Sequence, residues 1–206
     1  MCNQPYKVKD SIQEFIEELK AYDSISLDEI PEYRLFISQV EEFFDKKLGK
    51  NADYDEEKKV ISKTMIQNYI KDGLIMPPEG KSYNRNHVIL LAIIYNLKSI
   101  LTIRDIKKLL TPILEKVDVD NNEDSIEHIY NTFFSLKESF LDGFSKDLDK
   151  DIDLINQKLE NWGYGECQKI HKILLVLTLV TQANIRKRLA ERIIDLYFTD
   201  EEDPKE

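Results

Sequence analysis

The segment Ile61–Pro78 reads ISKTMIQNYIKDGLIMPP and contains a short helix together with its start and stop signals. Ser62 is a good N-cap residue, and a glycine such as Gly73 is a typical helix terminator. At about 100° per residue, the apolar and polar side chains of this stretch separate onto two arcs of a helix. The sequence therefore predicts a helix from Ser62 to Asp72 with one packed face and one polar face open to solvent or to a ligand.

The polar arc carries side chains that suit DNA. Lysines contact phosphate groups, and the amides of Gln and Asn match the hydrogen-bonding edge of adenine in the major groove. An ordinary solvated face is the alternative interpretation of this helix taken alone. We predict DNA base contacts from Gln67, Asn68 and Thr64, and DNA phosphate contacts from Lys63 and Lys71.

Two prolines and a glycine interrupt the chain between Leu74 and Tyr83. They exclude a helix and predict a short, basic-tipped β-hairpin or loop. We expect further phosphate contacts from this segment and from the polar loop that precedes the helix, namely from Lys81, Ser82, Tyr83, Arg85, Lys58 and Lys59. Tyr83 has two open interpretations, as a phosphate ligand or as a packing residue whose hydroxyl bonds to backbone.

The rest of the chain is predicted to be mainly helical, because its glycines and prolines lie almost entirely where periodic segments end. Apolar spacing and capping signals predict helices over residues 12–22, 33–48 with Gly49 as terminator, 84–101 with Asn84 as cap, 102–110 with a Thr102–Asp105 capping box, a restart at Thr111–Pro112, then 125–161 and 166–198. The predicted fold class is thus mainly α, with a short β wing and a C-terminal helical bundle.

Charge is distributed unevenly along the 206 residues, whose net charge is -10. Residues 58–112 carry 10 basic and 3 acidic side chains (net +7), whereas residues 1–57 have a net charge of -8 and residues 113–206 one of -9. The basic island coincides with the short helices and the hairpin. A basic face on a small helical module is the pattern expected of a nucleic-acid-binding protein.

These motifs together resemble the winged helix-turn-helix head of MerR-type regulators. The order is the same: a serine-capped recognition helix, Gly-Leu-Ile, prolines, the tyrosine Tyr83, a long helix, and the short helical motif from Ile103 to Leu110. Residues 33–40 followed by Lys63–Tyr69 resemble more closely an uncharacterised bacterial family of MerR-like proteins known only as a domain of unknown function. The resemblance implies a DNA-binding transcriptional regulator with double-stranded DNA as its partner.

The sequence also departs from the MerR pattern. That pattern has arginine where Gln67 stands and tyrosine where Asn68 stands, and its wing is longer and richer in arginine. The contacts made at those two positions in MerR-type proteins therefore do not carry over unchanged. Two interpretations stay open: either DNA is held more weakly here, or the loop lysines Lys58 and Lys59 substitute for the wing.

The resemblance also divides the chain into four regions. These are an N-terminal helix and linker (1–29), the MerR-like domain (30–115), a helical dimerisation or effector region (116–198) and an acidic tail (199–206). In MerR-type proteins the third region pairs two subunits, so we expect a homodimer, as two-half-site binding also suggests. Residues 173–180 are apolar on nearly every side and must be buried in a bundle or between subunits, with the dimer seam at Ile173, Leu174, Leu177 and Val180.

The long helix 125–161 carries an apolar series that includes Ile129, Phe133, Leu136, Phe140 and Phe144. With Tyr130, Phe134, Trp162 and Tyr164, the aromatic side chains of this region either line a pocket for a small apolar effector or form ordinary core. Both interpretations stay open.

Several classes of protein are not expected. The three histidines lack the spacings of catalytic or metal motifs, and two distant cysteines, Cys2 and Cys167, form no cluster, so we expect no enzyme, no metal and no cofactor. The longest nearly apolar run has eight residues, well short of the roughly 18 to 20 needed to span a membrane. These features and the absence of a visible secretory signal predict a cytoplasmic protein. The alternative to DNA binding is a helical adaptor for protein–protein interaction.

Overall fold

A computed structural model describes residues 12, 14–18, 25–49, 59–120, 124–163 and 168–198. Its elements run in the order η1 (Leu27–Glu29), β1 (Leu35–Phe36), α2 (Ile37–Leu48), α3 (Lys63–Lys71), β2 (Ser82–Tyr83), α4 (Arg85–Leu97), α5 (Ile103–Asp120), α6 (Asp124–Asn161) and α7 (Gln168–Tyr197). The described part is mainly helical with one small antiparallel sheet, β1 paired with β2. This confirms the mainly α class.

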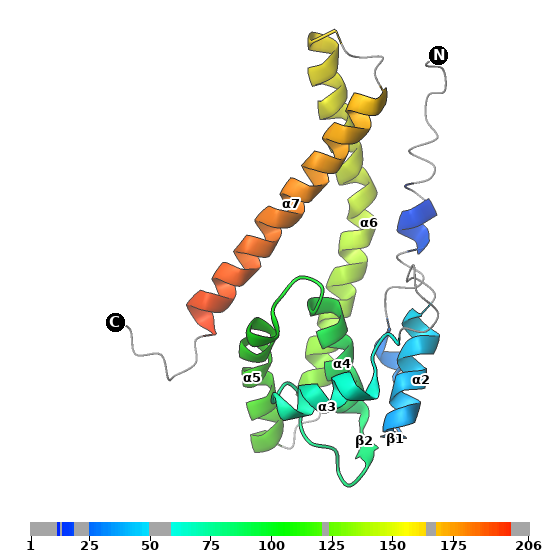
Figure 1. Cartoon of the computed structure of the whole chain (residues 1–206), viewed down its shortest axis with the longest axis vertical. Helices are drawn as coiled ribbons and strands as arrows, with labels where there is room; N and C mark the ends of the chain where they lie inside the picture. The colour runs from blue at the N-terminus through cyan, green and yellow to red at the C-terminus, as the bar shows by residue number, and fades with distance from the viewer. Residues whose placement is uncertain are drawn as a thin grey trace.

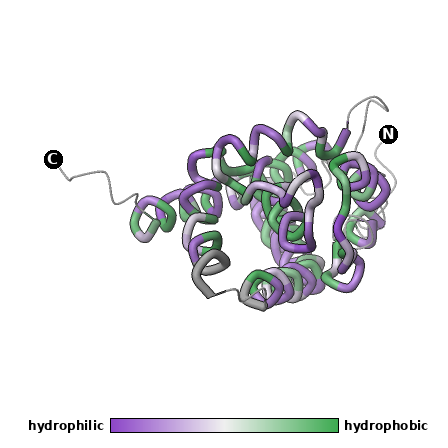
Figure 2. Tube along the Cα trace, turned by 90° about the horizontal axis from the view of Figure 1, so that it is seen from below, coloured by the Kyte–Doolittle hydropathy of each residue, from purple (hydrophilic) through white to green (hydrophobic). Residues whose placement is uncertain are grey.

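The short elements form a head at one end of the long helix α6, and α7 runs diagonally away from α6 (Figure 1). Helix α4 lies in the core of the head, where Val88–Ala92 and Ile94 are all buried. Phe44 of α2, Ile66 of α3 and Ile106 of α5 pack into the same cluster. Seen from below, hydrophobic and hydrophilic positions alternate along the helical tubes, as expected for amphipathic helices around one core (Figure 2).

Three of the predicted helix boundaries are confirmed by the capping contacts. Ser62 accepts a hydrogen bond from the backbone N–H of Met65 at the start of α3, and Gly73 follows this helix with φ of 73°. Asn84 accepts from the backbone N–H of His87 at the start of α4. Helix α2 ends at Leu48 with Gly49 as its C-cap.

Three predicted boundaries are wrong. The helix expected to run from residue 84 to residue 101 ends at Leu97. The helix expected from residue 33 begins at Ile37, because Leu35 and Phe36 pair as a strand with Tyr83 and Ser82. The chain does not restart at Thr111–Pro112, since α5 continues through Pro112 to Asp120. Pro112 removes one backbone donor, and the Thr111 hydroxyl donates to the carbonyl of Lys107 within the same helix (2.9 Å).

The predicted extents of the two long helices are confirmed. The apolar residues that were expected to face a core, however, are largely exposed. The buried residues of α6 include Ile126, Tyr130 and Leu148, whereas Ile129, Leu136 and Phe140 are exposed. In α7, Ile173, Val176, Leu177 and Val180 are exposed, as are Ile185, Leu189, Ile193 and Leu196. The described chain therefore does not bury this apolar segment in a bundle of its own.

Candidate nucleic-acid interface

Helix α3 separates its two faces as the sequence predicted. Ile66 and Tyr69 are buried, and Met65 and Ile70 pack partly against the core. The polar residues all lie exposed to solvent, namely Lys63, Thr64, Gln67, Asn68, Lys71 and Asp72. The structure thus brings the predicted base-contacting residues onto one open face.

Side chains of α2 hold the start of α3. Asp45 of α2 accepts a hydrogen bond from the backbone N–H of Val60 (3.0 Å) and forms an ion pair with Lys59 (2.5 Å). That ion pair raises the pKa of Lys59. Glu41 accepts from the backbone N–H of Lys63 (3.2 Å), and its other oxygen lies 3.9 Å from the Lys63 ammonium. These contacts set the direction in which α3 points, and they also neutralise two of the predicted phosphate ligands.

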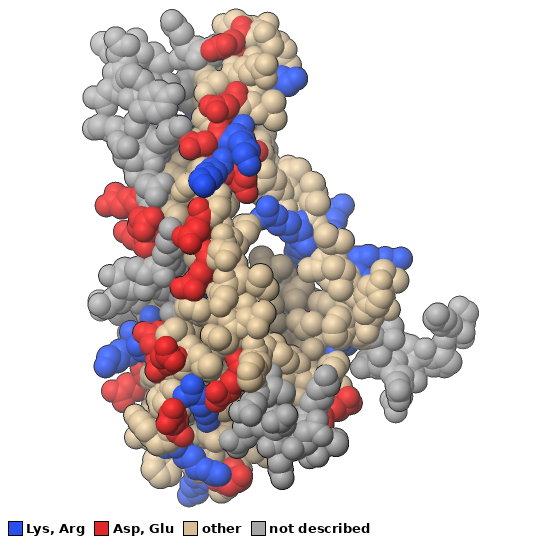
Figure 3. All heavy atoms as spheres, turned by 180° about the vertical axis from the view of Figure 1, so that it is seen from behind, with Lys and Arg blue, Asp and Glu red and all other residues tan. Residues whose placement is uncertain are grey.

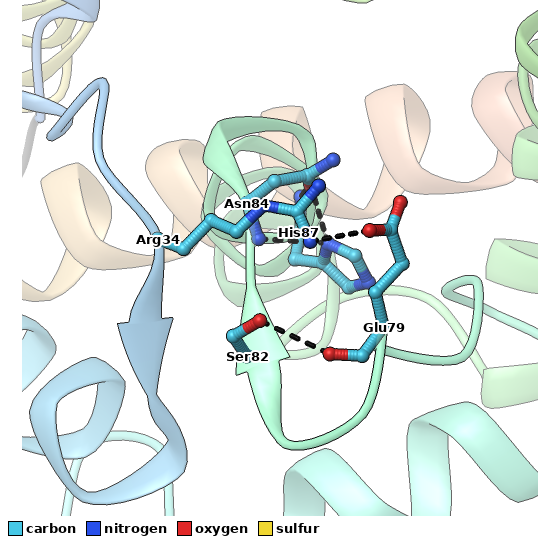
Figure 4. A network of polar contacts seen from close by, with 5 residues as sticks. All are labelled: Arg34, Glu79, Ser82, Asn84 and His87. Carbon is cyan, nitrogen blue, oxygen red and sulfur yellow. Dashed lines mark hydrogen bonds and ion pairs between the residues drawn. The ribbon is translucent and has the colours of Figure 1, made fainter.

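The predicted hairpin is smaller than expected, and its strand β2 pairs with β1 instead of with residues 74–78. Residues 74–78 form no strand; instead Glu79 bridges to Ser82 around Gly80, whose φ is 65°. The Ser82 hydroxyl donates to the Glu79 carbonyl (3.0 Å), and the Glu79 carboxylate pairs with Arg34 (Figure 4). That ion pair holds the pKa of Glu79 below its usual range. We call residues 79–83 the wing loop, and its tip presents Lys81 to solvent.

Tyr83, the last residue of the wing loop, packs against His87 of α4. Tyr83 is only 4% exposed and its ring meets the His87 ring edge-on, with 5.4 Å between centroids. Burial raises the pKa of Tyr83. Of the two interpretations of this tyrosine, the structure favours the packing residue.

Burial lowers the pKa of His87, so the imidazole is neutral at pH 7. Its Nδ1 lies 3.2 Å from the backbone nitrogen and 2.5 Å from the side-chain oxygen Oδ1 of Asn84. The carbonyls of Pro77 and Met76 and the charge of Glu79 oppose the lowering of the pKa. This buried ring anchors the wing loop to the first turn of α4.

Arg85 does not project from the interface. Its guanidinium donates to the carbonyls of Ile30 (2.8 Å) and Leu27 (3.0 Å) and pairs with Glu127 of α6 (2.6 Å). These bonds tie Leu27 of η1, the adjoining Ile30 and helix α6 to the first residue of α4. The structure therefore gives Arg85 a positioning role in place of the predicted phosphate contact.

The charge of the basic island is partly cancelled within the chain. Besides the three ion pairs above that involve Lys59, Lys63 and Arg85, Lys108 lies 3.8 Å from Asp195 of α7. Figure 3 shows basic and acidic side chains interspersed over the rear face of the molecule. Within the described residues, Lys71, Lys81 and Lys107 have no ion-pair partner. Lys58 lies outside the described residues.

Lys107 is a basic residue that the sequence did not assign to the interface. A Cβ placed on Gly73 would lie 3.7 Å from both Cε and Nζ of Lys107, so this lysine of α5 reaches the end of α3. No local pattern could reveal this neighbour, because 34 residues separate the two positions.

The residues of the expected dimer seam lie close together on one helix, whereas the aromatic residues of the expected effector pocket do not lie close together. Ile173, Leu177 and Val180 are exposed together along α7, and Leu174 is partly buried. The aromatic residues are spread along α6: Tyr130 contacts Phe133, Phe140 contacts Phe144, and Trp162 is exposed. Tyr164 lies outside the described residues. The contacting aromatic residues of α6 thus form two separate pairs instead of one ring of side chains.

The side chains and helices of the described residues also bear on metal and membrane binding. No group of three His, Cys, Asp or Glu side chains that could hold a metal ion occurs among them. None of the helices in the part of the chain that the structure describes is long and apolar enough to cross a membrane. Cys2 and Cys167 lie outside that part.

A family model described as Domain of unknown function (DUF1836) matches residues 25–133. The match covers the head and the first turns of α6. It therefore includes the α3 face, the wing loop and the Arg85–Glu127 ion pair. No curated protein and no solved structure matches the chain.

Proposed function

The chain belongs to the family of the domain of unknown function DUF1836, and we propose that it is a cytoplasmic transcriptional regulator that binds double-stranded DNA. In this proposal α2 and α3 form a MerR-like helix-turn-helix, and the wing loop flanks it. Helix α3 enters the major groove with its open face toward the bases.

The exposed polar face of α3 is the observation that carries the proposal. A helix whose apolar side packs against the core, and whose opposite side presents Thr64, Gln67 and Asn68, offers amide and hydroxyl groups at one open surface. Side-chain amides can make two hydrogen bonds to an adenine edge, and a hydroxyl can bond to several bases. Ordinary solvated helices have no need of a wing beside them, whereas this one lies at the same end of the head as the wing loop (Figure 1).

Phosphate contacts would come from both sides of α3. Lys71 and Lys107 lie near its C-terminal end, and Lys81 and Ser82 lie on the wing loop. Lys63 and Lys59 would have to exchange their carboxylate partners for phosphate. Fewer free cations favour modest non-specific affinity, since each phosphate contact adds to a salt-dependent term.

The two-half-site arrangement of helix-turn-helix proteins also requires a dimer. The exposed side chains Ile173, Leu177 and Val180 of α7 form the proposed seam between two copies, because soluble monomers rarely leave large adjoining apolar side chains uncovered. Both parts of the proposal can be tested separately.

Duplex binding as a function of salt tests the proposal. The full-length protein should bind an AT-containing duplex with an affinity that falls steeply as salt rises. Lys71→Ala combined with Lys107→Ala should weaken binding to every sequence by more than about tenfold. It should also reduce the slope of log affinity against log salt by the amount expected for about two phosphate contacts. Gln67→Ala with Asn68→Ala should instead relax the preference for one sequence.

The matched control is Lys146→Ala with Lys158→Ala. This pair removes the same charge from exposed positions of α6, away from α3, and should leave binding unchanged. If both lysine pairs weaken binding equally, the effect reflects net charge and the proposed interface is wrong.

A protein-interaction adaptor is the second candidate function. It is favoured by the ion pairs that neutralise Lys59, Lys63, Arg85 and Lys108. The absence of any binding to genomic fragments at about 50 mM salt, where DNA contacts are strong, would select this candidate.

A further inference from the structure

Two exposed aromatic side chains lie beside the wing loop. Phe36, the second residue of β1, is 61% exposed, and Tyr33, two residues before the start of β1, is 69% exposed. Among the described residues between 25 and 120, Tyr33 and Phe36 are the aromatic residues with exposed side chains. The other exposed aromatic side chains lie near the N-terminus, on α6 and α7, or just after α6.

The sheet register places Phe36 on the outer face of the wing. Leu35 pairs with Tyr83 and Phe36 pairs with Ser82. Directly opposed residues of antiparallel strands share a face of the sheet, and neighbouring residues alternate between faces. Leu35 and Tyr83 are both buried, so Phe36 and Ser82 lie together on the outward face.

Phe36 is also an unusual residue for its local position. It is the N-cap of α2, where Ser, Thr, Asp or Asn can accept a hydrogen bond from the first turn. The Phe36 ring can accept none of these bonds, and the cap is completed only by its backbone N–H, which donates to Oε1 of Gln39 (2.8 Å). A residue that serves neither the cap nor the core is expected where function has overridden local preference.

The charges around Phe36 favour a polyanion as its partner. Glu79, the acidic residue of the wing loop, is neutralised by Arg34, while Lys81 at its tip is exposed and has no ion-pair partner among the described residues. An apolar ring next to a hydroxyl and a free lysine resembles the surfaces that touch sugar, phosphate and base edges in a DNA groove.

We propose that Phe36 is an apolar wedge that contacts the minor groove of DNA, next to the major-groove site read by α3. The inference rests on the proposed DNA-binding function and adds a specificity-determining residue to it. The ring packs against deoxyribose and base edges, and it favours easily unstacked steps such as TA and CA. Because the contact is apolar, it releases no counterions.

Binding of the full-length protein to a defined duplex tests this role. The probe is a duplex of about 30 base pairs, long enough for two half-sites one helical turn apart, that the wild-type chain has selected from a random pool. Phe36→Ala should weaken binding about tenfold or more, because the ring loses an apolar contact, and should leave the dependence on salt unchanged. A 2-aminopurine placed at the flanking step should brighten with wild type and not with Phe36→Ala.

Two further variants serve as controls. Trp162→Ala removes an equally exposed aromatic side chain just after α6 and should bind like wild type. Phe36→Leu keeps an apolar wedge and should retain most of the affinity. Thermal unfolding of Phe36→Ala should match wild type, since the ring is exposed and the cap uses backbone.

The possible results separate the two proposals. If wild type binds no duplex, the DNA-binding function itself is wrong. If wild type binds and Phe36→Ala binds equally well with the same 2-aminopurine signal, the wedge is wrong and the function stands. A Phe36→Ala variant that keeps its DNA affinity but loses self-association would assign the ring to a protein contact and overturn the inference.

Discussion

The head and helix α7 use apolar side chains in opposite ways. In the head, residues such as Phe44, Ile66 and Leu91 are fully buried. In α7, Ile194 is buried at one end, whereas Leu177 is 56% exposed and several neighbouring aliphatic residues are exposed as well. The head core is therefore closed, with Ile194 of α7 among its buried residues. The rest of α7 carries more apolar surface than the described part of the chain covers.

The course of α7 explains this excess. Gln182 of α7 bonds to Asp151 of α6, while Ile194 packs into the head core and Asp195 lies near Lys108 of α5. The helix packs first on one neighbour and then on another, using different sides. At about 100° per residue, the exposed group Ile173–Val180 and the exposed group from Ile185 to Leu196 lie on opposite sides of the helix. Two separate apolar faces are thus left open.

Removing a large side chain from each region should give the largest contrast. Phe44→Ala should lower the free energy of unfolding by about 3–5 kcal/mol, because it leaves a cavity in a close-packed core. Leu177→Ala should change it by less than about 0.5 kcal/mol in the monomer, as is usual for surface positions. Urea unfolding at low protein concentration measures both values, and equal losses would show that α7 is buried in solution.

A second contrast concerns association. Leu177→Asp with Val180→Asp should abolish the dimer at tens of micromolar protein, since each carboxylate buried without a partner costs several kcal/mol. Ile185→Asp with Leu189→Asp places the same charges on the opposite side of α7 and is the matched control. Size-exclusion chromatography with light scattering reports the mass.

Each outcome of that experiment assigns a face. Loss of the dimer only in the first variant supports the seam at residues 173–180, and loss only in the control moves the seam to the second face. A wild-type species of 24.3 kDa at the same concentration would contradict both the seam and the two-half-site arrangement.

The sequence was sufficient to predict α3 and its open face because the signals involved are local. Ser62 and Gly73 bound the helix, and the spacing of apolar residues within nine positions determines which side packs. The same reasoning predicted the cap at Asn84 and the Thr102–Asp105 capping box. Short-range hydrogen bonds of this kind depend little on the rest of the fold.

The sequence could not predict features that depend on distant partners. Strand β1 forms because Leu35 meets Tyr83, a residue 48 positions away. The sequence predicts a phosphate contact from Arg85, because only the fold brings Glu127 and the carbonyls of Leu27 and Ile30 to it. The net charge of residues 58–112 overstated the basic surface for the same reason, since acidic residues outside that segment fold back onto it.

The smallest predicted effect is a dependence of stability on pH. It contrasts His87 of the head with His128 of the long helix α6. Because burial holds the pKa of His87 below its usual value of 6.5, the unfolded chain binds a proton more readily than the folded chain as the pH falls below about 6.5. The free energy of unfolding should therefore decrease by at most about 1.4 kcal/mol per pH unit between pH 6.5 and the lower folded-state value. Below that value this contribution stops changing.

Substitution of the histidine isolates this term. His87→Gln cannot titrate, so its urea midpoint should fall less than that of wild type between pH 7.5 and about 5.5, a range above the titration of ordinary carboxylates. His128→Gln removes an exposed histidine of α6 and should keep the full wild-type decrease. If His87→Gln loses stability on acidification as steeply as wild type does, the imidazole is not buried as a neutral group. The wing loop would then be anchored to α4 by Asn84 and Tyr83 alone.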